Sequence, residues 1–371
     1  MEVIKSVRKE IMTLNHYVAG RMPGKSKSGR MIKLASNENR FGSSPKAMAA
    51  VRAAAAGELS IYPDSKMNAL RAAVCGYWER LGVNVSPQEL LFGDGSGEVL
   101  NMLLAGFAQE GGSVLFPVNS FMLYRLLTIP KGAQAVMTLR KSDYSADLDS
   151  LAGAAGAPGV KAVILSNPDN PTSTFYRPNE IAGFMDKVPA HVPVILDEAY
   201  IHFAGMENSA IKLLGSYENL ILIYTFSKCY GLAGLRVGYG VMRSPLAEQI
   251  EKLRLPFNLG TIQQAGAAAA LGDDEFLGMT VRETARGREY LTDKLKALGL
   301  DTAVPGGNFI FVDLGMRYLE ILEALDNEGI SVRSLSDFGF GDRFARITVG
   351  TMEENELLVK TLTNMTTGNI I

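Results

Sequence analysis

The chain has 371 residues, of which 47% are hydrophobic and 20% are charged. This composition supports a sizeable core and excludes a disordered protein, and the length predicts two or three domains, or one large core with a smaller appendage. The formal net charge is −2, from 37 Lys and Arg against 39 Asp and Glu. No global basic field therefore favours nucleic acid or an anionic membrane.

The two cysteines exclude a disulfide framework. The first dozen residues are charged throughout, so we expect no secretory segment. The longest uncharged stretch, 255–272, contains proline, asparagine and glutamine, which does not suit a membrane span. We therefore expect a soluble protein of a reducing compartment, the cytoplasm.

The N-terminal third begins with predicted helices at 45–56, where Pro45 suits a first turn, and at 65–81, where apolar residues recur every three or four positions. Helical stretches at 99–107 and 178–187 follow. Between the helices lie short apolar runs that do not alternate, as is typical of strands buried on both faces of a parallel sheet. These runs are 89–92, 113–116, 161–165, 193–196 and 220–224. The pattern predicts an α/β fold.

The C-terminal hundred residues differ in pattern. A helix is predicted at 281–298, a strand at 309–314, a helix near 317–328 and a strand at 345–349. We expect a large sheet domain at 45–255 and a smaller α+β domain built from both chain ends, 1–44 and 256–371.

Functional residues are expected where the predicted strands end, because α/β proteins bind ligands beyond the carboxyl ends of their strands. The glycine-rich 93–98 opens a helix whose N–H groups can hold a phosphate, although an ordinary strand-to-helix turn has the same sequence pattern. In 167–172, two prolines bracket Asn170 and fix its amide, although a surface turn is the simpler interpretation.

Two further strand ends carry charged residues. Asp197 follows a buried strand, where an ionised acid needs a partner such as a protonated ring nitrogen. Metal ligation is the alternative, but the histidines have no ligand spacing with Asp197. Lys228 follows the next strand; a lone lysine is nearly always solvated, yet in a closed site it can lose its proton and form an imine. Ser227 and Arg236 would add phosphate ligands.

One ligand uses all four strand ends, and that ligand is pyridoxal phosphate. Its aldehyde needs a lysine, its ring nitrogen an acid, its phenolic oxygen an amide and the Tyr200 hydroxyl, and its phosphate a cradle. An acid at the ring nitrogen keeps that nitrogen protonated, so the ring can accept electrons from a carbanion.

Six motifs also occur in the order of a known family. They are KLASNEN at 33–39, YPD at 62–64, SNPDNPT at 166–172, DEAY at 197–200, TFSKCYGLAGLR at 225–236 and RITVGT at 346–351. Across most of its length the chain thus resembles the fold type I, class I/II aminotransferases, and within them the histidinol-phosphate aminotransferase family. The resemblance implies an enzyme that depends on pyridoxal phosphate, with a large, mostly parallel sheet domain covered by helices on both faces.

The resemblance also implies residue roles. Lys228 would form the internal aldimine and move the proton, Asp197 would pair with the ring nitrogen, and Tyr200 would bond the ring oxygen. The implied cofactor contacts are Tyr62, Ser96, Gly97, Glu98, Phe121, Asn170, Asp197, Tyr200, Ser227, Lys228 and Arg236. Phe121 would stack on the ring, although a plain core position competes, and Tyr62 would reach the phosphate across a homodimer interface. The implied substrate contacts are Tyr17, Asn37, Arg333 and Arg346.

The implied reaction transfers the amino group of histidinol phosphate to 2-oxoglutarate, a step of histidine biosynthesis. Arg346 would bind the keto acid's carboxylate and Arg333 the distal phosphate, although a surface strand residue is a competing interpretation of Arg333. A threonine-phosphate decarboxylase-like lyase would release carbon dioxide without a keto acid, and an aromatic amino acid aminotransferase would need no substrate phosphate. Both remain alternatives, whereas the lysine disfavours a purely binding role. We expect no nucleic acid, membrane or metal partner.

Three residues depart from the family pattern. Arg40 stands where proline is usual, and we expect it to add positive charge beside the substrate pocket. Gly97 replaces an acid and Ser173 a glycine, and we expect both changes to leave cofactor binding intact. A loose P-loop pattern at 19–26 suggests a nucleotide-binding protein, but the residues after it do not look like the helix that a P-loop needs.

Overall fold

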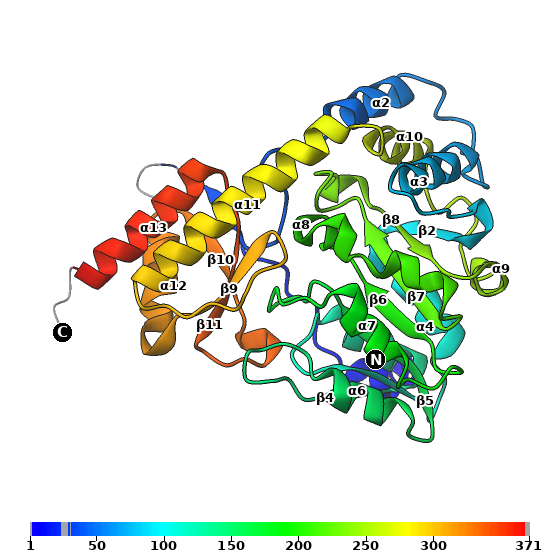
Figure 1. Cartoon of the computed structure of the whole chain (residues 1–371), viewed down its shortest axis with the longest axis horizontal. Helices are drawn as coiled ribbons and strands as arrows, with labels where there is room; N and C mark the ends of the chain where they lie inside the picture. The colour runs from blue at the N-terminus through cyan, green and yellow to red at the C-terminus, as the bar shows by residue number, and fades with distance from the viewer. Residues whose placement is uncertain (1, 24–28, 30, 368–371) are drawn as a thin grey trace.

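The computed structural model describes residues 2–23, 29 and 31–367, and within them the chain forms a seven-stranded sheet and a four-stranded sheet (Figure 1). The large sheet has the order β2-β8-β7-β6-β5-β3-β4. Its neighbours are parallel except at β8, which runs antiparallel to both β7 and β2. The strands are β2 (Leu90–Asp94), β3 (Ser113–Pro117), β4 (Gln134–Thr138), β5 (Val160–Ser166), β6 (Val194–Asp197), β7 (Leu220–Thr225) and β8 (Val237–Val241).

The central strands are mostly apolar because both of their faces are buried, and their polar residues lie near the strand ends. In β6, Val194 and Leu196 pack into one core cluster, whereas Ile195 between them packs into the other. The first cluster lies under α2 (Pro45–Ala55), α3 (Asn68–Arg80), α6 (Leu148–Ala155), α7 (Pro178–Met185) and α10 (Thr261–Ala270). The second lies under α4 (Gly95–Phe107), α5 (Leu123–Thr128) and α9 (Ser244–Glu251). The expected parallel sheet with helices on both faces is therefore confirmed.

The small sheet joins the two ends of the chain. Its order is β1-β10-β11-β9, in which β1 is parallel to β10 and the other neighbours are antiparallel. The strands are β1 (Ile32–Leu34), β9 (Phe309–Asp313), β10 (Ile330–Ser334) and β11 (Phe344–Thr348). A third core cluster packs the sheet against α11 (Asp274–Ala297), α12 (Tyr318–Asn327) and α13 (Met352–Thr367).

The long helix α11 connects the two parts of the molecule (Figure 1). Leu277, near its start, packs against the core of the large sheet, whereas Leu291 and Leu295 lie in the core of the small sheet. The helix before it, α10, packs on α2 and α3. The chain directly after residue 256 therefore contacts the large-sheet core.

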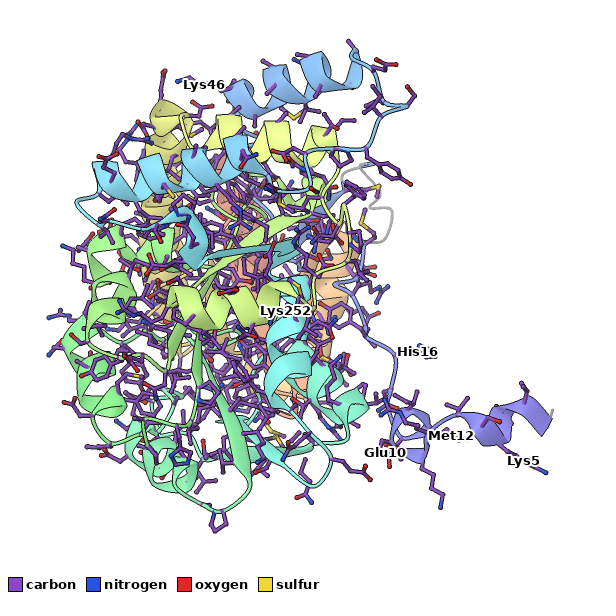
Figure 2. All side chains as sticks on the ribbon, turned by 90° about the vertical axis from the view of Figure 1, so that its right-hand side faces the viewer. Lys5, Glu10, Met12, His16, Lys46 and Lys252 are labelled. Carbon is purple, nitrogen blue, oxygen red and sulfur yellow. The ribbon has the colours of Figure 1, made fainter. Side chains whose placement is uncertain are left out.

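The N-terminal residues lie apart from both sheets. Figure 2 shows the segment that carries Lys5, Glu10 and Met12 extending away from the body of the molecule. This segment includes α1 (Lys9–Met12), and the Arg8 side chain beside it donates to the carbonyl of Pro130. Of the P-loop pattern, residues 24–26 lie outside the described residues, and the next described element is strand β1 rather than a helix. Among the helices of the described ranges, none is long and apolar enough to cross a membrane.

Candidate active site

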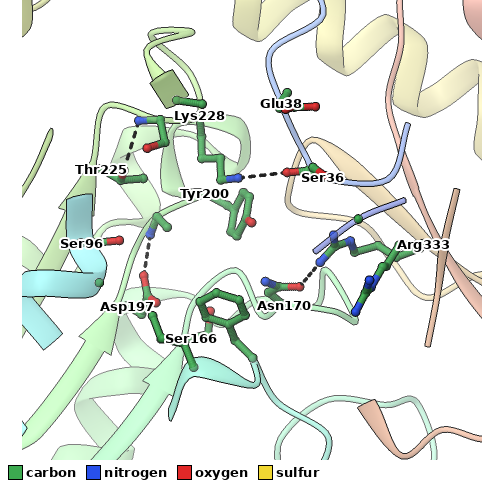
Figure 3. Close-up of a pocket in the computed structure, with 18 of the residues that line it drawn as sticks. Ser36, Glu38, Ser96, Ser166, Asn170, Asp197, Tyr200, Thr225, Lys228 and Arg333 are labelled. Atoms are coloured by element: carbon green, nitrogen blue, oxygen red, sulfur yellow. Dashed lines mark hydrogen bonds between the residues drawn. The ribbon is translucent and has the colours of Figure 1, made fainter. Parts of the chain in front are cut away.

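A cavity of about 280 Å³ opens where β5, β6 and β7 end, and it extends to the small sheet (Figure 3). Lys228, Asp197 and Ser96 enter it from the large-sheet side, and Arg333 enters from the small-sheet side. Most of the residues expected from the sequence line this cavity. They are Tyr17, Ser96, Gly97, Phe121, Asn170, Asp197, Tyr200, Ser227, Lys228, Arg236, Arg333 and Arg346.

Lys228 lies three residues beyond the end of β7. Its Nζ donates to the carbonyl oxygens of Ser36 and Asn37, both at 3.3 Å. The same Nζ lies 5.4 Å from the centre of the Tyr200 ring. Asn37 is itself buried and donates through Nδ2 to the Tyr200 hydroxyl at 3.1 Å. The segment that follows β1 therefore closes over the lysine and the tyrosine together.

Asp197 is the last residue of β6 and is buried. The Tyr124 hydroxyl donates to its Oδ2 at 2.9 Å, and the Ala199 N–H donates to its Oδ1 at 3.1 Å. Burial raises the pKa of Asp197 to about 6, although both hydrogen bonds and the charge of Lys228 act in the opposite direction. An ionised carboxylate here would be stabilised by a cationic ligand group in the cavity.

An anion cradle is formed where helix α4 begins. Ser96 and Gly97 belong to its first turn, and Gly95 before them has a φ of +71°. A Cβ at Gly95 would lie 2.4 Å from Nη2 of Arg236, so only glycine lets this guanidinium approach the helix. Arg236 also donates through Nη1 to Ser227 Oγ at 3.3 Å. A helix N-terminus, two hydroxyls and a guanidinium together suit a phosphate.

Two arginines line the small-sheet side of the cavity. Arg333 and Arg346 are register partners on β10 and β11, so their side chains lie next to each other on one face. Arg346 donates to Asn170 Oδ1 at 2.5 Å and to the Ala35 carbonyl at 2.9 Å. Its Nε has no hydrogen-bond partner among the described residues. Burial lowers the pKa of Arg346 to about 10, and the neighbouring charge of Arg333 lowers it further.

Arg333 is held from two sides. It donates through Nη1 to the Ala19 carbonyl at 2.9 Å, and its Nη2 lies 3.7 Å from Asp337 Oδ2. Its guanidinium also lies 5.5 Å from the centre of the Phe338 ring. It is a buried residue of β10 facing the cavity, so the competing interpretation as a surface strand residue is wrong. Together the arginines offer two adjacent positions for anionic groups.

Three expected residues do not line the cavity. Asn37 acts behind it, through Tyr200. Glu98 accepts hydrogen bonds from the backbone of Asp94 and from Asn258 Nδ2, so its carboxylate holds the turn before α4. Tyr62 is 78% exposed and stacks on Phe257 with 4.4 Å between the ring centres. Within one chain, Glu98 and Tyr62 thus lie away from the space available to a ligand.

The three departures have distinct structural consequences. The Arg40 guanidinium forms a two-bond ion pair with Glu354 and does not line the cavity, so its charge is compensated rather than added to the pocket. The Glu354 partner also raises the pKa of Arg40. Ser173 keeps the positive φ (+65°) that glycine would adopt, and its Oγ accepts from the Gly307 N–H at 2.8 Å. Gly97 leaves room for Leu123, which would lie 3.3 Å from a Cβ.

Sequence reasoning missed several residues of the cavity wall. Tyr124, which bonds Asp197, lies in α5 three residues after Phe121, and the two rings pack edge to face with 5.8 Å between their centres. No local signal in the sequence marks this tyrosine as a cavity residue. The other missed lining residues are Gly20, Ala35, Ser36, Glu38, Leu123, Ser166, Ala199, Thr225, Ala233 and Phe338. Within the described ranges, no three His, Cys, Asp or Glu side chains gather as metal ligands would.

Comparison with known proteins identifies the class. The family described as "aminotransferase class I and II" matches residues 29–362. The histidinol-phosphate aminotransferase of Brevibacillus brevis is 39% identical over 91% of this chain and 91% of its own length, and that of Anaeromyxobacter sp. is 38% identical over 88% of each. Among solved structures, the histidinol-phosphate aminotransferase of Sinorhizobium meliloti in complex with pyridoxal-5'-phosphate has a TM-score of 0.84 and 26% identity, with 98% of each chain covered.

The sheet and the lysine just beyond β7 suit an α/β enzyme that forms an imine with a carbonyl compound. The chain belongs to the aminotransferase class I and II family, and it is an aminotransferase. The family resemblance read from the six motifs is thereby confirmed.

Proposed function

We propose that this aminotransferase uses pyridoxal phosphate to transfer the amino group of histidinol phosphate to 2-oxoglutarate. One observation carries the proposal: a single cavity holds Lys228 and Asp197 on one side and the adjacent Arg333 and Arg346 on the other. The names of the relatives, which match nine-tenths of the chain, support this substrate.

The residues present fit the cofactor. Asp197 is a buried carboxylate that forms no ion pair with another described residue, as a site for a protonated ring nitrogen requires. Asn170 Oδ1 accepts a hydrogen bond from Arg346 Nη1, which leaves the Nδ2 of Asn170 to donate to other acceptors. The cradle at the start of α4 would hold the phosphate. When bound, pyridoxal phosphate supplies an aldehyde for Lys228 and a ring that withdraws electrons from the substrate's reacting carbon.

The chain's own residues then have separable tasks. Lys228 Nζ holds and moves the proton, because it is the basic group that enters the centre of the cavity from the large-sheet side. Asp197 holds a positive charge at the end of β6, and Tyr124 keeps its carboxylate oriented. Asn37 orients the Tyr200 hydroxyl. Tyr17 and Gly20 also line the cavity, and we expect the segment that joins them to limit access of water to the bound substrate.

Substrate recognition rests on the two arginines. Histidinol phosphate lacks a carboxylate, so its phosphate is its main anchor, and we assign that anchor to Arg333 with Tyr17 beside it. The keto acid has a carboxylate next to its reacting carbon, and we assign that group to Arg346. Two neighbouring cations allow one cavity to accept both substrates in turn.

We also propose a homodimer in which Tyr62 reaches the partner's site. Tyr62 and Phe257 stack on each other among exposed apolar side chains, which are Leu59, Ile61 and Leu255. Such a patch favours a protein interface.

We place the small domain at residues 1–44 and from α11 onward, later than the 256 expected from sequence, because α10 packs on α2 and α3. A cytoplasmic location stays a prediction.

The test is a single half-reaction with cofactor-loaded protein and histidinol phosphate, without keto acid. The visible absorption of the bound cofactor is followed, and the cofactor product is identified. Conversion to pyridoxamine phosphate supports the proposal. Release of carbon dioxide from phosphothreonine would instead support the lyase, and conversion by tyrosine but not by histidinol phosphate would support an aromatic aminotransferase.

A further inference from the structure

A buried ion pair lies behind the cavity. Arg140, just after the edge strand β4, has a side chain that is only 5% exposed, and its Nη2 lies 3.1 Å from Oδ2 of Asp169, whose side chain is 4% exposed. Neither residue lines the cavity. Two charges this deeply buried each depend on the other, because either one alone would lack a counter-charge in a medium of low dielectric constant.

On one side, the Arg140 guanidinium holds the loop that precedes Phe121. Its Nε donates to the Val118 carbonyl at 2.7 Å, and its Nη2 donates to Ser120 Oγ at 3.2 Å. Its Nη1 donates to the Tyr144 carbonyl at 3.0 Å. Phe121 follows directly after Ser120 and lines the cavity. The position of this ring therefore depends on a loop fixed by Arg140.

On the other side, Asp169 holds the loop that carries Asn170. Its Oδ2 accepts from the Thr172 hydroxyl at 2.8 Å as well as from Arg140. Asn170 lies between these two residues and lines the cavity. The ion pair thus joins the two loops that carry Phe121 and Asn170.

We propose that Arg140 and Asp169 are positioning residues that set the separation of Phe121 from Asn170, and hence the orientation of an aromatic ring that contacts both. This inference rests on the proposed function, because the ring is that of pyridoxal phosphate. The planar guanidinium reaches acceptors in three segments at once, and the single ammonium of lysine cannot reproduce that fork. A misplacement of about 1 Å at such a contact can lower the reaction rate on the order of a hundredfold.

The test compares cofactor binding in full-length variants. Arg140→Lys keeps the charge but loses the fork, and Asp169→Asn keeps the shape but loses the charge. Each variant is freed of cofactor and titrated with pyridoxal phosphate; absorbance gives the dissociation constant and visible circular dichroism reports the orientation of the ring. We expect an affinity loss of about tenfold or more, the effect of losing one hydrogen bond to a charged group, together with a changed dichroic band.

The matched control is Glu251→Gln, which alters the partly buried Arg71–Glu251 pair beside the edge strand β2, where Arg71 also donates to the Leu90 carbonyl. We expect it to lower the melting temperature and to leave cofactor affinity and the dichroic band unchanged. If one positioning variant does not fold, the other carries the test.

Two outcomes would overturn the proposal, and they differ. Unchanged affinity and an unchanged band in variants that only melt earlier would show a purely structural pair, with the proposed function intact. Failure of the unaltered chain to bind pyridoxal phosphate would remove the proposed function and this inference with it.

Discussion

Replacing Asp197 with asparagine should stabilise the cofactor-free protein while impairing the loaded one. Burial raises the pKa of Asp197 from 3.8 to about 6, so the folded chain holds a proton that the unfolded chain has already lost. The stability that this group contributes is fully present below 3.8 and is lost as the pH rises through 6. Asparagine does not titrate, and its amide can still accept from the Ala199 N–H and donate to the Tyr124 oxygen.

The size of the effect follows from the shift. About two pKa units correspond to roughly 3 kcal/mol, so the variant's free energy of unfolding should exceed that of the unaltered chain by up to about 3 kcal/mol at pH 8. At pH 5, where the folded carboxyl is mostly protonated, the difference should be about half as large. Urea unfolding of cofactor-free protein at both pH values measures it.

Glu198 beside it is also buried, and burial raises its pKa to about 7, but Glu198 is present in both chains and largely cancels in the comparison. A variant that is less stable at pH 8, or an advantage of equal size at both pH values, would refute the reasoning. In the loaded enzyme the same variant should bind pyridoxal phosphate more weakly, because the positive ring nitrogen loses its counter-charge.

Three further substitutions test the site. Lys228→Ala should abolish multiple turnovers in a steady-state assay, and continued turnover would contradict its role as the group that moves the proton. Arg333→Gln should raise the KM for histidinol phosphate by about tenfold or more, since hydrogen bonds to charged groups are among the strongest; an equal rise for a donor without phosphate would count against the clamp. Arg40→Met should lower the free energy of unfolding by roughly 1–3 kcal/mol through loss of the Glu354 pair. The preference among amino donors should stay unchanged in competition assays, and a changed preference would show that Arg40 does act on the substrate pocket.

The central strands could be predicted from sequence because each is a short, continuous run of apolar residues. β6 and β7 are apolar up to their carboxyl ends, since successive side chains enter opposite core clusters. Strand β8 was missed because VGYGV contains two glycines, which weaken a strand pattern. Gly238 is needed there because a Cβ would lie 2.2 Å from the backbone nitrogen of Ser96. The close contact between Gly238 and the Ser96 backbone thus requires the same glycine that makes β8 hard to predict from sequence.

The candidate site was partly predictable for a similar reason. Asn170, Asp197 and Lys228 lie at a strand end or within four residues beyond one, so the strands largely determine their positions. Tyr124 lies 73 residues before Asp197, and nothing local distinguishes it from a core tyrosine. Glu98 was expected to contact the cofactor but does not line the cavity. An acid in the first turn of a helix can accept from free backbone N–H groups and need not contact a ligand.

Strands β10 and β11 give the molecule a modular character. Arg333 and Arg346 lie within one continuous stretch, 330–348, whereas Asp197 and Lys228 belong to the other sheet. Under the proposed assignment, mutations at Arg333 would alter which distal anion is accepted while Asp197 and Lys228 stay unchanged. Arg346 in the same stretch also donates to Asn170, and Thr348 accepts from the Asn37 N–H. An exchange that keeps Arg346 and Thr348 and varies the rest of 330–348 is therefore the natural unit for redesigning the substrate.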